Sequence, residues 1–380
     1  MKVAVTTLAV CVAVLLSLGL VMLYSSGLYH KSGADLSSRF LLKQLLWCVV
    51  GLVACITAAA LDYRLVKRWV WPLLGLAVLL LLWVQIKGRV VNGATRWLDL
   101  PGGIRFQPSE LAKIALILAL AWYCERYQRQ MHAWKRGILF PSLFIGLTVG
   151  LIFKAPDVGG ALLITLVCGL MLLMAGIRAK HFLPPVFAVV IAVGIFLHTN
   201  QMRSERIYSW LHLEETKLAK GHQVYQAILA LGSGGWSGVG LGNSRQKLGW
   251  VPEYQTDFIL AIIGEELGLV ATLGVVLGFV LIVICGTYIA AHARDKFGTM
   301  LAAGITFLIG FQAFINIGVV TNTLPNKGIA LPFISYGGSS LLAMLGCVGL
   351  LFSVARQGRM PEFKPVNPFA AEELPAAQST

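Results

Sequence analysis

Residues 258–291 read FILAIIGEELGLVATLGVVLGFVLIVICGTYIAA, an apolar stretch of 34 residues with two charged side chains, Glu265 and Glu266. A helix needs about 20 apolar residues to cross the hydrocarbon core of a membrane. This stretch therefore predicts a transmembrane helix that tilts strongly or extends past the bilayer. Nine further segments meet or approach the same length, at residues 3–28, 42–61, 69–86, 108–124, 137–153, 158–177, 181–198, 297–322 and 337–356.

The predicted fold is an all-α polytopic membrane protein with ten transmembrane helices, and the composition agrees. Of the 380 residues, 57% are hydrophobic and 13% are charged, and that charged fraction is about half of what a soluble domain carries. So few charges leave no adequate polar shell, which excludes a soluble enzyme, a disordered protein, a collagen and a small secreted disulfide scaffold. The seven cysteines lie in or beside apolar runs without CxxC spacing, so we interpret them as packing residues.

Ten crossings place both termini on one side of the membrane, and the short loops on that side are cationic. The positive-inside rule makes this side the cytoplasm. The net charge of +14 is thus mainly a topology signal and does not indicate a nucleic-acid partner. We expect one membrane domain over residues 1–357, with a large extracytoplasmic loop at about 199–257 between helices seven and eight. Residues 358–380 are rich in Pro and Ala and predict a disordered cytoplasmic tail.

The outer end of the fourth segment combines a helix start with an ionisable pair. The run Arg105-Phe-Gln-Pro-Ser-Glu-Leu-Ala-Lys113 places Pro108 at the first helical position, which proline favours. Glu110 and Lys113 then lie three residues apart on one face of the helix. Ionisable residues inside a membrane segment indicate a functional site by default, although a self-contained structural ion pair also explains these two.

Two further outer connections carry charges. Lys154-Ala-Pro-Asp157 joins two helices with almost no loop, so Asp157 can cap the helix that follows; a cap does not explain Lys154. The last outer loop, 324–340, contains Lys327, two prolines and the paired glycines before Ser339, and these disfavour an ordinary helix. We predict an unwound or re-entrant segment that lines a cavity, with Lys327 at its mouth.

The long outer loop has a polar part, a glycine-rich part and an aspartate at its end. Residues 203–222 are polar and are expected to be irregular. The glycine-rich run 232–242 lacks the GKS or GKT of a P-loop and follows no strand, so it indicates a backbone that passes close to another part of the molecule. Asp257 stands where the loop enters the eighth helix, and Thr256 or Asp257 can be its N-cap.

Cations therefore gather on the outer face around one loop carboxylate, at the level of the lipid headgroups. Cations there favour a phosphate or pyrophosphate headgroup, and a carboxylate beside a hydroxyl can act as a general base. Together they suit transfer of a group from a lipid pyrophosphate to an alcohol, with the cations stabilising the departing pyrophosphate. Glu265 and Glu266 must be paired, hydrated or protonated at their depth, and we expect a structural pair with a polar neighbour.

Five blocks of this sequence resemble the SEDS family, the shape, elongation, division and sporulation proteins of bacteria. The blocks occur in the expected order, at residues 92–97, 106–113, 156–157, 246–268 and 331–341. The sequence departs from the family at Gly160, where a Thr or Ser is usual, which puts a role for that hydroxyl in doubt. It also departs before Gly221, where a basic, aromatic segment replaces the usual Asp-Pro-rich form.

The resemblance implies a peptidoglycan glycosyltransferase that polymerises lipid II on the outer side of the cytoplasmic membrane. Asp257 matches the family's loop aspartate, the candidate catalytic base that deprotonates the 4-hydroxyl of the acceptor GlcNAc for attack on the donor MurNAc with inversion. Arg105, Lys113 and Lys327 match family cations that hold the pyrophosphate. The substrate-binding residues that we expect are Arg105, Glu110, Lys113, Lys154, Asp157, Lys247, Lys327 and Ser339.

Within the family, Lys327 and the runs 242–248 and 263–266 resemble the cell-division branch, FtsW, more than the elongation branch, RodA. This implies septal cell-wall synthesis in the bacterial inner membrane, with both termini cytoplasmic. The implied partners are lipid II, the nascent glycan strand, a class B penicillin-binding protein transpeptidase and other membrane proteins of the divisome. The family also implies a divalent cation, Mg2+ or Mn2+, which would bind with the pyrophosphate because no protein ligand set is visible. No organic cofactor is expected.

Two other classes of function stay open on the residues alone. A lipid II flippase or other transporter would place polar groups near the membrane midplane, and Glu265 and Glu266 are the best argument for one. The clustering of polar residues on the outer side favours an enzyme instead. A non-catalytic scaffold of a cell-wall complex is the second alternative, and loss of activity on replacing Asp257 would discriminate against both. An elongation role of the RodA type is the alternative to division.

Overall fold

The structure is a computed structural model that describes residues 1–27, 34–91, 94–100, 104–199, 201–219, 221–248, 251 and 254–358. The expected disordered tail, 358–380, lies outside the described residues except for Gly358. The elements are α1 (Lys2–Gly27), α2 (Ala34–Ala60), α3 (Tyr63–Lys87), β1 (Arg89–Val91), β2 (Ala94–Leu100), β3 (Ile104–Phe106), α4 (Pro108–Arg126), α5 (Phe140–Lys154), α6 (Val158–Met174), α7 (Ala179–Thr199), α8 (Gln201–Leu211), α9 (Leu213–Thr216), α10 (His222–Ser233), α11 (Ile259–Ala291), α12 (Lys296–Val320) and α13 (Gly338–Gln357).

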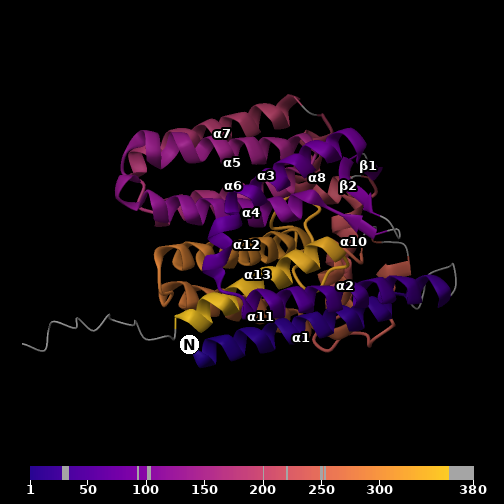
Figure 1. Ribbon diagram of the computed structural model, residues 1–380. Helices are drawn as coiled ribbons and strands as arrows, with labels where there is room; N and C mark the ends of the chain where they lie inside the picture. Colours follow the sequence, from indigo (N-terminus) through magenta and orange to yellow (C-terminus); the bar gives the residue numbers. More distant parts are fainter. Residues whose placement is uncertain are drawn as a thin grey trace, which may run out of the picture.

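The long helices lie side by side with their axes roughly aligned, from α7 at one edge of the view to α1 at the other, with α12 and α13 between them (Figure 1). Within the apolar spans of α12 and α13, 67% and 72% of residues are buried, against 22–33% in the other five spans. A helix that is apolar all round and poorly buried by protein fits a lipid environment. The arrangement is therefore a polytopic membrane bundle whose central helices are α12 and α13.

Seven helices in the described part of the chain are long and apolar enough to cross a membrane. The other three expected segments are also helical, as α4, α6 and α7. Helix α4 carries four charged residues in its 19 positions, and α6 has only 17 residues. The predicted fold class is confirmed, whereas the count of ten spans is not confirmed by length and composition.

Two outer segments differ from the expectation from sequence. Residues 203–222 are not irregular, because α8 and α9 cover most of them; the sequence from Gln201 to Ala219 contains neither glycine nor proline and is rich in residues that tolerate a helix. A small antiparallel sheet, in the order β1-β2-β3, also joins α3 to α4. Its sequence signal was the Asn-Gly pair at 92–93, a dipeptide that favours tight hairpins.

The last outer loop agrees with the prediction of an unwound segment. Residues 321–337 form turns, bends and irregular backbone between α12 and α13, without a helix. Pro325 and Pro332 remove backbone donors that a helix would need. The loop thus supplies free carbonyl and amide groups that other parts of the molecule bind, and these contacts build the site described next.

Candidate functional site

Asp257 lies directly before α11, and its carboxylate faces the last outer loop. The N-cap position of α11 is Phe258, so the prediction that Thr256 or Asp257 occupies it is wrong. A Cβ added at Gly328 would come within 2.7 Å of Asp257 Oδ2. Glycine at 328 therefore lets the carboxylate lie against the loop backbone, next to Lys327.

The segment before α11 is fixed to this loop by backbone and hydroxyl contacts. The Tyr336 amide donates to the carbonyl of Gln255 at 2.9 Å. The hydroxyl of Ser335 donates to the carbonyl of Thr256 and accepts from the amide of Leu331 at 2.8 Å. Two loops that are far apart in sequence are thereby joined at the two residues that precede Asp257.

Two buried carboxamide side chains of α12 also hydrogen-bond to the backbone of these loops. Asn316 Nδ2 donates to the carbonyl of Asp257 at 2.8 Å and to the carbonyl of Ile329 at 2.7 Å. Gln312, one turn earlier, donates through Nε2 to the carbonyl of Ala330 at 3.0 Å. A carboxamide nitrogen has two N–H donors, and Asn316 uses them to bridge the two loops.

The cationic side of the site is built where β3 meets α4. The backbone amide of Gln107 donates to Ser339 Oγ at 3.1 Å, which fixes this junction to the start of α13. Arg105, half exposed on β3, lies 3.9 Å from Asp99. Burial raises the pKa of Tyr336 and the charge of Arg105 opposes that rise. Arg105 therefore lies near Tyr336, whose backbone amide binds the carbonyl of Gln255.

Glu110 and Lys113 form a buried ion pair one turn into α4. Lys113 Nζ lies 2.9 Å from Glu110 Oε1, and their side chains are 5% and 10% exposed. Glu110 Oε2 has no hydrogen-bond partner among the described residues. Pro108 occupies the first turn as predicted. The expected pairing is thus present, and the role of these residues in substrate binding stays a prediction.

Asp157 caps α6, as expected from its place in the sequence. Its carboxylate accepts from the amide of Gly160 at 3.1 Å and from Ser109 Oγ at 3.2 Å. Arg96 adds a charge 3.9 Å away. Lys154 is exposed at the end of α5. Asp157 therefore fixes β2, α4 and α6 to one another, whereas Lys154 points a cation towards the surroundings.

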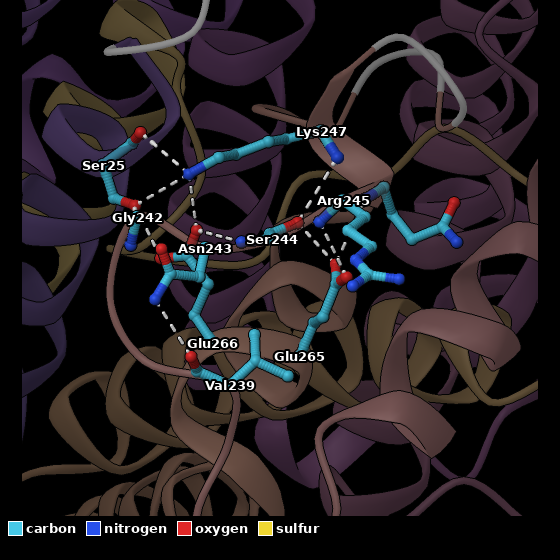
Figure 2. Close-up of polar contacts among 10 residues, drawn as sticks. Ser25, Val239, Gly242, Asn243, Ser244, Arg245, Lys247, Glu265 and Glu266 are labelled. Atoms are coloured by element: carbon cyan, nitrogen blue, oxygen red, sulfur yellow. Dashed lines mark hydrogen bonds and ion pairs between the residues drawn. The ribbon is translucent and has the colours of Figure 1, made fainter.

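A second polar cluster occupies the interior beside α11 (Figure 2). Lys247 Nζ lies 2.7 Å from Glu266 Oε1, and both side chains have no exposed area. The same ammonium reaches the carbonyl and hydroxyl of Ser25 at 3.2 and 3.3 Å. Glu265 accepts the hydroxyl of Ser244 and the amide of Arg245, the latter at 2.9 Å. The prediction that the two glutamates are paired with polar neighbours is confirmed.

The glycine-rich run packs across a break in α11. At Gly268 the backbone has φ 77° and ψ −173°, which interrupts the helix. The break leaves two carbonyls available, and the amides of Val239 and Gly240 donate to those of Glu265 and Glu266 at 3.0 Å. A Cβ at Gly268 would lie 2.4 Å from the nitrogen of Gly238. The predicted close approach of this backbone is therefore confirmed.

Comparison with known proteins decides the family. Residues 6–360 match the family model FTSW_RODA_SPOVE, described as "Cell cycle protein". The chain belongs to the FtsW/RodA/SpoVE family. It is 39% identical to the "Probable peptidoglycan glycosyltransferase FtsW" of Trichlorobacter lovleyi, over 92% of each chain. It is also 39% identical to "Stage V sporulation protein E" of Bacillus subtilis, over 93% of this chain and 97% of the relative.

Solved structures of the FtsW/RodA/SpoVE family share this fold. A chain from work on "Structural coordination of polymerization and crosslinking by a peptidoglycan synthase complex" has a TM-score of 0.77 and 28% identity, covering 93% of this chain and 98% of that chain. The rod shape determining protein RodA of Thermus thermophilus has a TM-score of 0.69 and 28% identity, covering 93% and 97%. The polytopic helical fold of the family is thereby shown for this chain.

Two buried carboxamides of α12 that support the loops around the site in this FtsW/RodA/SpoVE chain escaped the sequence analysis, Gln312 and Asn316. The signal was present, because polar side chains one turn apart in an apolar membrane segment indicate function by default. Their acceptors could not be foreseen, since the carbonyl of Asp257 lies 59 positions away in the chain. The described residues contain no group of three or more His, Cys, Asp or Glu side chains that could hold a metal ion.

Proposed function

We propose that this chain is a peptidoglycan glycosyltransferase that polymerises lipid II on the outer face of the bacterial cytoplasmic membrane. The observation that carries the proposal is the contact between the Asp257 carboxylate and Gly328, beside Lys327. It brings a base and a cation together from two separate loops. The names of the relatives, probable peptidoglycan glycosyltransferases, support the same activity.

In the proposed reaction, Asp257 takes the proton of the 4-hydroxyl of the acceptor GlcNAc as that oxygen attacks the anomeric carbon of the donor MurNAc. The new glycosidic C–O bond forms on the face opposite the bond that breaks, so the configuration inverts. The leaving group is the lipid pyrophosphate with its bonding electron pair. Asp257 lies at the junction of its loop with a long helix, which limits its movement and suits a positioned base.

The departing pyrophosphate gains negative charge, and cations near it stabilise the transition state. Lys327 and Arg105 are proposed for this role, because Gly328 beside Lys327 faces the Asp257 carboxylate, and Arg105 lies near Tyr336, whose amide binds Gln255. Lys113 is buried against Glu110, so we assign it to the wall of the site. A divalent cation fits this scheme as a companion of the pyrophosphate oxygens, since phosphate groups hold Mg2+ well.

The proposed setting is division, in complex with a class B penicillin-binding protein transpeptidase and other divisome membrane proteins. Relatives named FtsW are 36–40% identical to this chain, whereas the RodA structure is 28% identical. A structural neighbour comes from a peptidoglycan synthase complex in which polymerization and crosslinking are coordinated. We place both termini in the cytoplasm on the basis of loop charge.

The arrangement of the glutamates disfavours a transporter. A transport site needs polar groups that can exchange partners near the midplane. Glu266 is fully buried in contact with Lys247, and Glu265 is saturated by a hydroxyl and backbone amides. These two residues therefore fix the fold around α11 and leave the outer face as the place of chemistry.

The test is polymerisation of purified lipid II by the full-length chain together with a class B penicillin-binding protein. We expect Asp257→Asn to fold normally and to lose at least about 100-fold in rate, since a general base contributes roughly 10²–10⁴-fold. Thermal unfolding of both proteins provides the folding control. Full polymerase activity of Asp257→Asn would overturn the assignment of the base, and an inactive wild-type complex would favour the scaffold.

A further inference from the structure

Asn316 lies outside the two loops beside the proposed base, and its side chain hydrogen-bonds to the backbone of both. Its single nitrogen donates to the carbonyl of Asp257 and to the carbonyl of Ile329. Ile329 follows Gly328, whose backbone faces the Asp257 carboxylate. Both distances are under 3.0 Å, which is normal for a strong N–H···O bond. One carboxamide of α12 thus links the two loops at Asp257 itself, in addition to the contacts that Ser335 and Tyr336 make at the two residues before it.

The position of Asn316 suits this task. It lies in α12, a central helix of the bundle, and is 1% exposed. The Ala261 amide of α11 donates to the carbonyl of Phe258, the residue after Asp257. A rigid helix, α12, supplies a hydrogen bond to the carbonyl of Asp257, and side chains on rigid elements hold a site more accurately than loops do.

The nitrogen and the oxygen of the Asn316 carboxamide differ in their hydrogen bonding. The Oδ1 atom of Asn316 is buried without a hydrogen-bond partner in the described part of the chain. An unmatched buried acceptor is unfavourable, so an apolar side chain of similar size would avoid that loss. The two donated bonds are what an apolar residue could not provide.

We propose that Asn316 is a positioning residue, which holds the Asp257 carboxylate in register with the Lys327 loop. The inference rests on the proposed function for its meaning in catalysis, but the geometry that it claims can be measured separately. Asn316 acts through the backbone of Asp257 and Ile329 and does not touch the substrate.

Gln312 provides the matched control. It lies on the same face of α12, one turn away, is 2% exposed and also has a buried oxygen without a described partner. Its nitrogen donates to Ala330 in the same loop but has no bond to Asp257. Gln312→Leu therefore removes the same chemical group from the same environment while leaving the Asp257 segment attached.

The first experiment measures the geometry without polymerisation of lipid II. Asp257→Cys and Gly328→Cys are combined, because a side chain at 328 would meet the one at 257, and disulfide formation is followed in the full-length protein in membranes. We expect Asn316→Leu to slow this cross-link by about 10-fold, with Gln312→Leu within about threefold of the parent. Equal rates in all three proteins would overturn the proposal.

The second experiment measures polymerisation of lipid II by the complex with a class B penicillin-binding protein. A misplacement of about 1 Å can cost about 100-fold in rate, so we expect Asn316→Leu to lower kcat by about 10- to 100-fold. KM should stay within about twofold, and Gln312→Leu should keep kcat within about threefold. Asn316→Asp has the same shape but lacks the two donors, and it should resemble Asn316→Leu if packing is not the cause.

The outcomes of the two experiments separate the two proposals. A wild-type complex that makes no polymer would sink the proposed function, while the cross-linking rates still decide the role of Asn316. If Asn316→Asp keeps wild-type kcat, or if Asn316→Leu and Gln312→Leu lose kcat equally and in proportion to their loss of Tm, Asn316 is structural and the proposal is wrong.

Discussion

At the scale of single residues, the lysines of the proposed site differ in how accessible their charge is to a bound anion. Lys113 is buried with its carboxylate partner at 2.9 Å, so its charge is largely neutralised. Lys327 is half-buried in a loop whose next residue faces Asp257. Charged hydrogen bonds contribute about 1.5–3 kcal/mol each. Among these two, Lys327 is therefore better placed to bind an anionic headgroup.

We expect Lys327→Ala to raise KM for lipid II by roughly 10-fold or more, since about 1.4 kcal/mol corresponds to tenfold in binding. Its Tm should change little, because a loop cation adds little packing. The charge-matched control is Lys135→Ala, at an exposed position on a connection that we assign to the cytoplasm, and it should leave KM unchanged. A fall in Tm that accounts for the whole loss of activity would show that Lys327 has a structural role instead.

Residues with local partners were predictable from the sequence, and residues with distant partners were not. Pro108, Asp157 and the Glu110–Lys113 pair were expected because their partners lie within four positions in the chain. Asn316 was missed because its role depends on hydrogen bonds to two loop carbonyls, and only the tertiary fold brings these carbonyls close to it. The irregularity expected over 203–222 was wrong, since polarity without Gly or Pro does not exclude a helix.

At the scale of elements, the break in α11 and the glycine-rich run form one unit. The run 232–242 donates amides to carbonyls that the break at Gly268 leaves available. Non-helical backbone at membrane depth is tolerated only where protein groups satisfy it. Glycine is needed at 268 for two reasons, its positive φ of 77° and the nitrogen of Gly238 at 2.4 Å from a Cβ.

Gly268→Ala should therefore lower the free energy of unfolding by about 1–3 kcal/mol, the range for a strained backbone position. Gly274→Ala, six residues later in the same helix, is the matched control. A Cβ at 274 meets nothing within 4 Å, and alanine is the better helix former by about 1 kcal/mol. Thermal unfolding of the two variants should shift Tm in opposite directions, and a shared loss would contradict this account of the break.

At the scale of the whole molecule, the two ends of the bundle carry different kinds of polar group. The outer end holds two loops joined through backbone carbonyls, with Asp257 and Lys327 on them. The end that we assign to the cytoplasm holds charged pairs between helices: Lys67 lies 2.8 Å from Glu125 and 3.4 Å from Asp295. The proposed chemistry is thus at one end of the bundle, and the ion pairs that join α3 to α4 and to the start of α12 are at the other.

Asp295 belongs to the ion pairs at the end that we assign to the cytoplasm, and its pKa predicts how stability changes with pH. Burial acts to raise its pKa, but the amide of Gly298, the hydroxyl of Tyr63 and the charges of Lys67 and Arg64 together hold the pKa below its usual 3.8. A carboxyl whose pKa is lowered by folding stabilises the protein above its unfolded pKa, and that stabilisation is lost as pH falls through the folded pKa. The window therefore begins near pH 4 and extends to lower pH.

We expect Asp295→Asn to have a lower Tm than the wild type at pH 7. When the pH falls to 3, the Tm of the variant should fall by less than the Tm of the wild type. The reason is that asparagine keeps part of the hydrogen bonding but has no charge to lose. The control is Glu214→Gln, because Glu214 is 78% exposed and its pair with Lys217 joins neighbours in sequence; an exposed pair contributes about 0–1 kcal/mol. Thermal unfolding of the three proteins across this pH range measures the effect. Parallel curves of Tm against pH for Asp295→Asn and the wild type would show that the contact between α3 and the start of α12 does not depend on this charge.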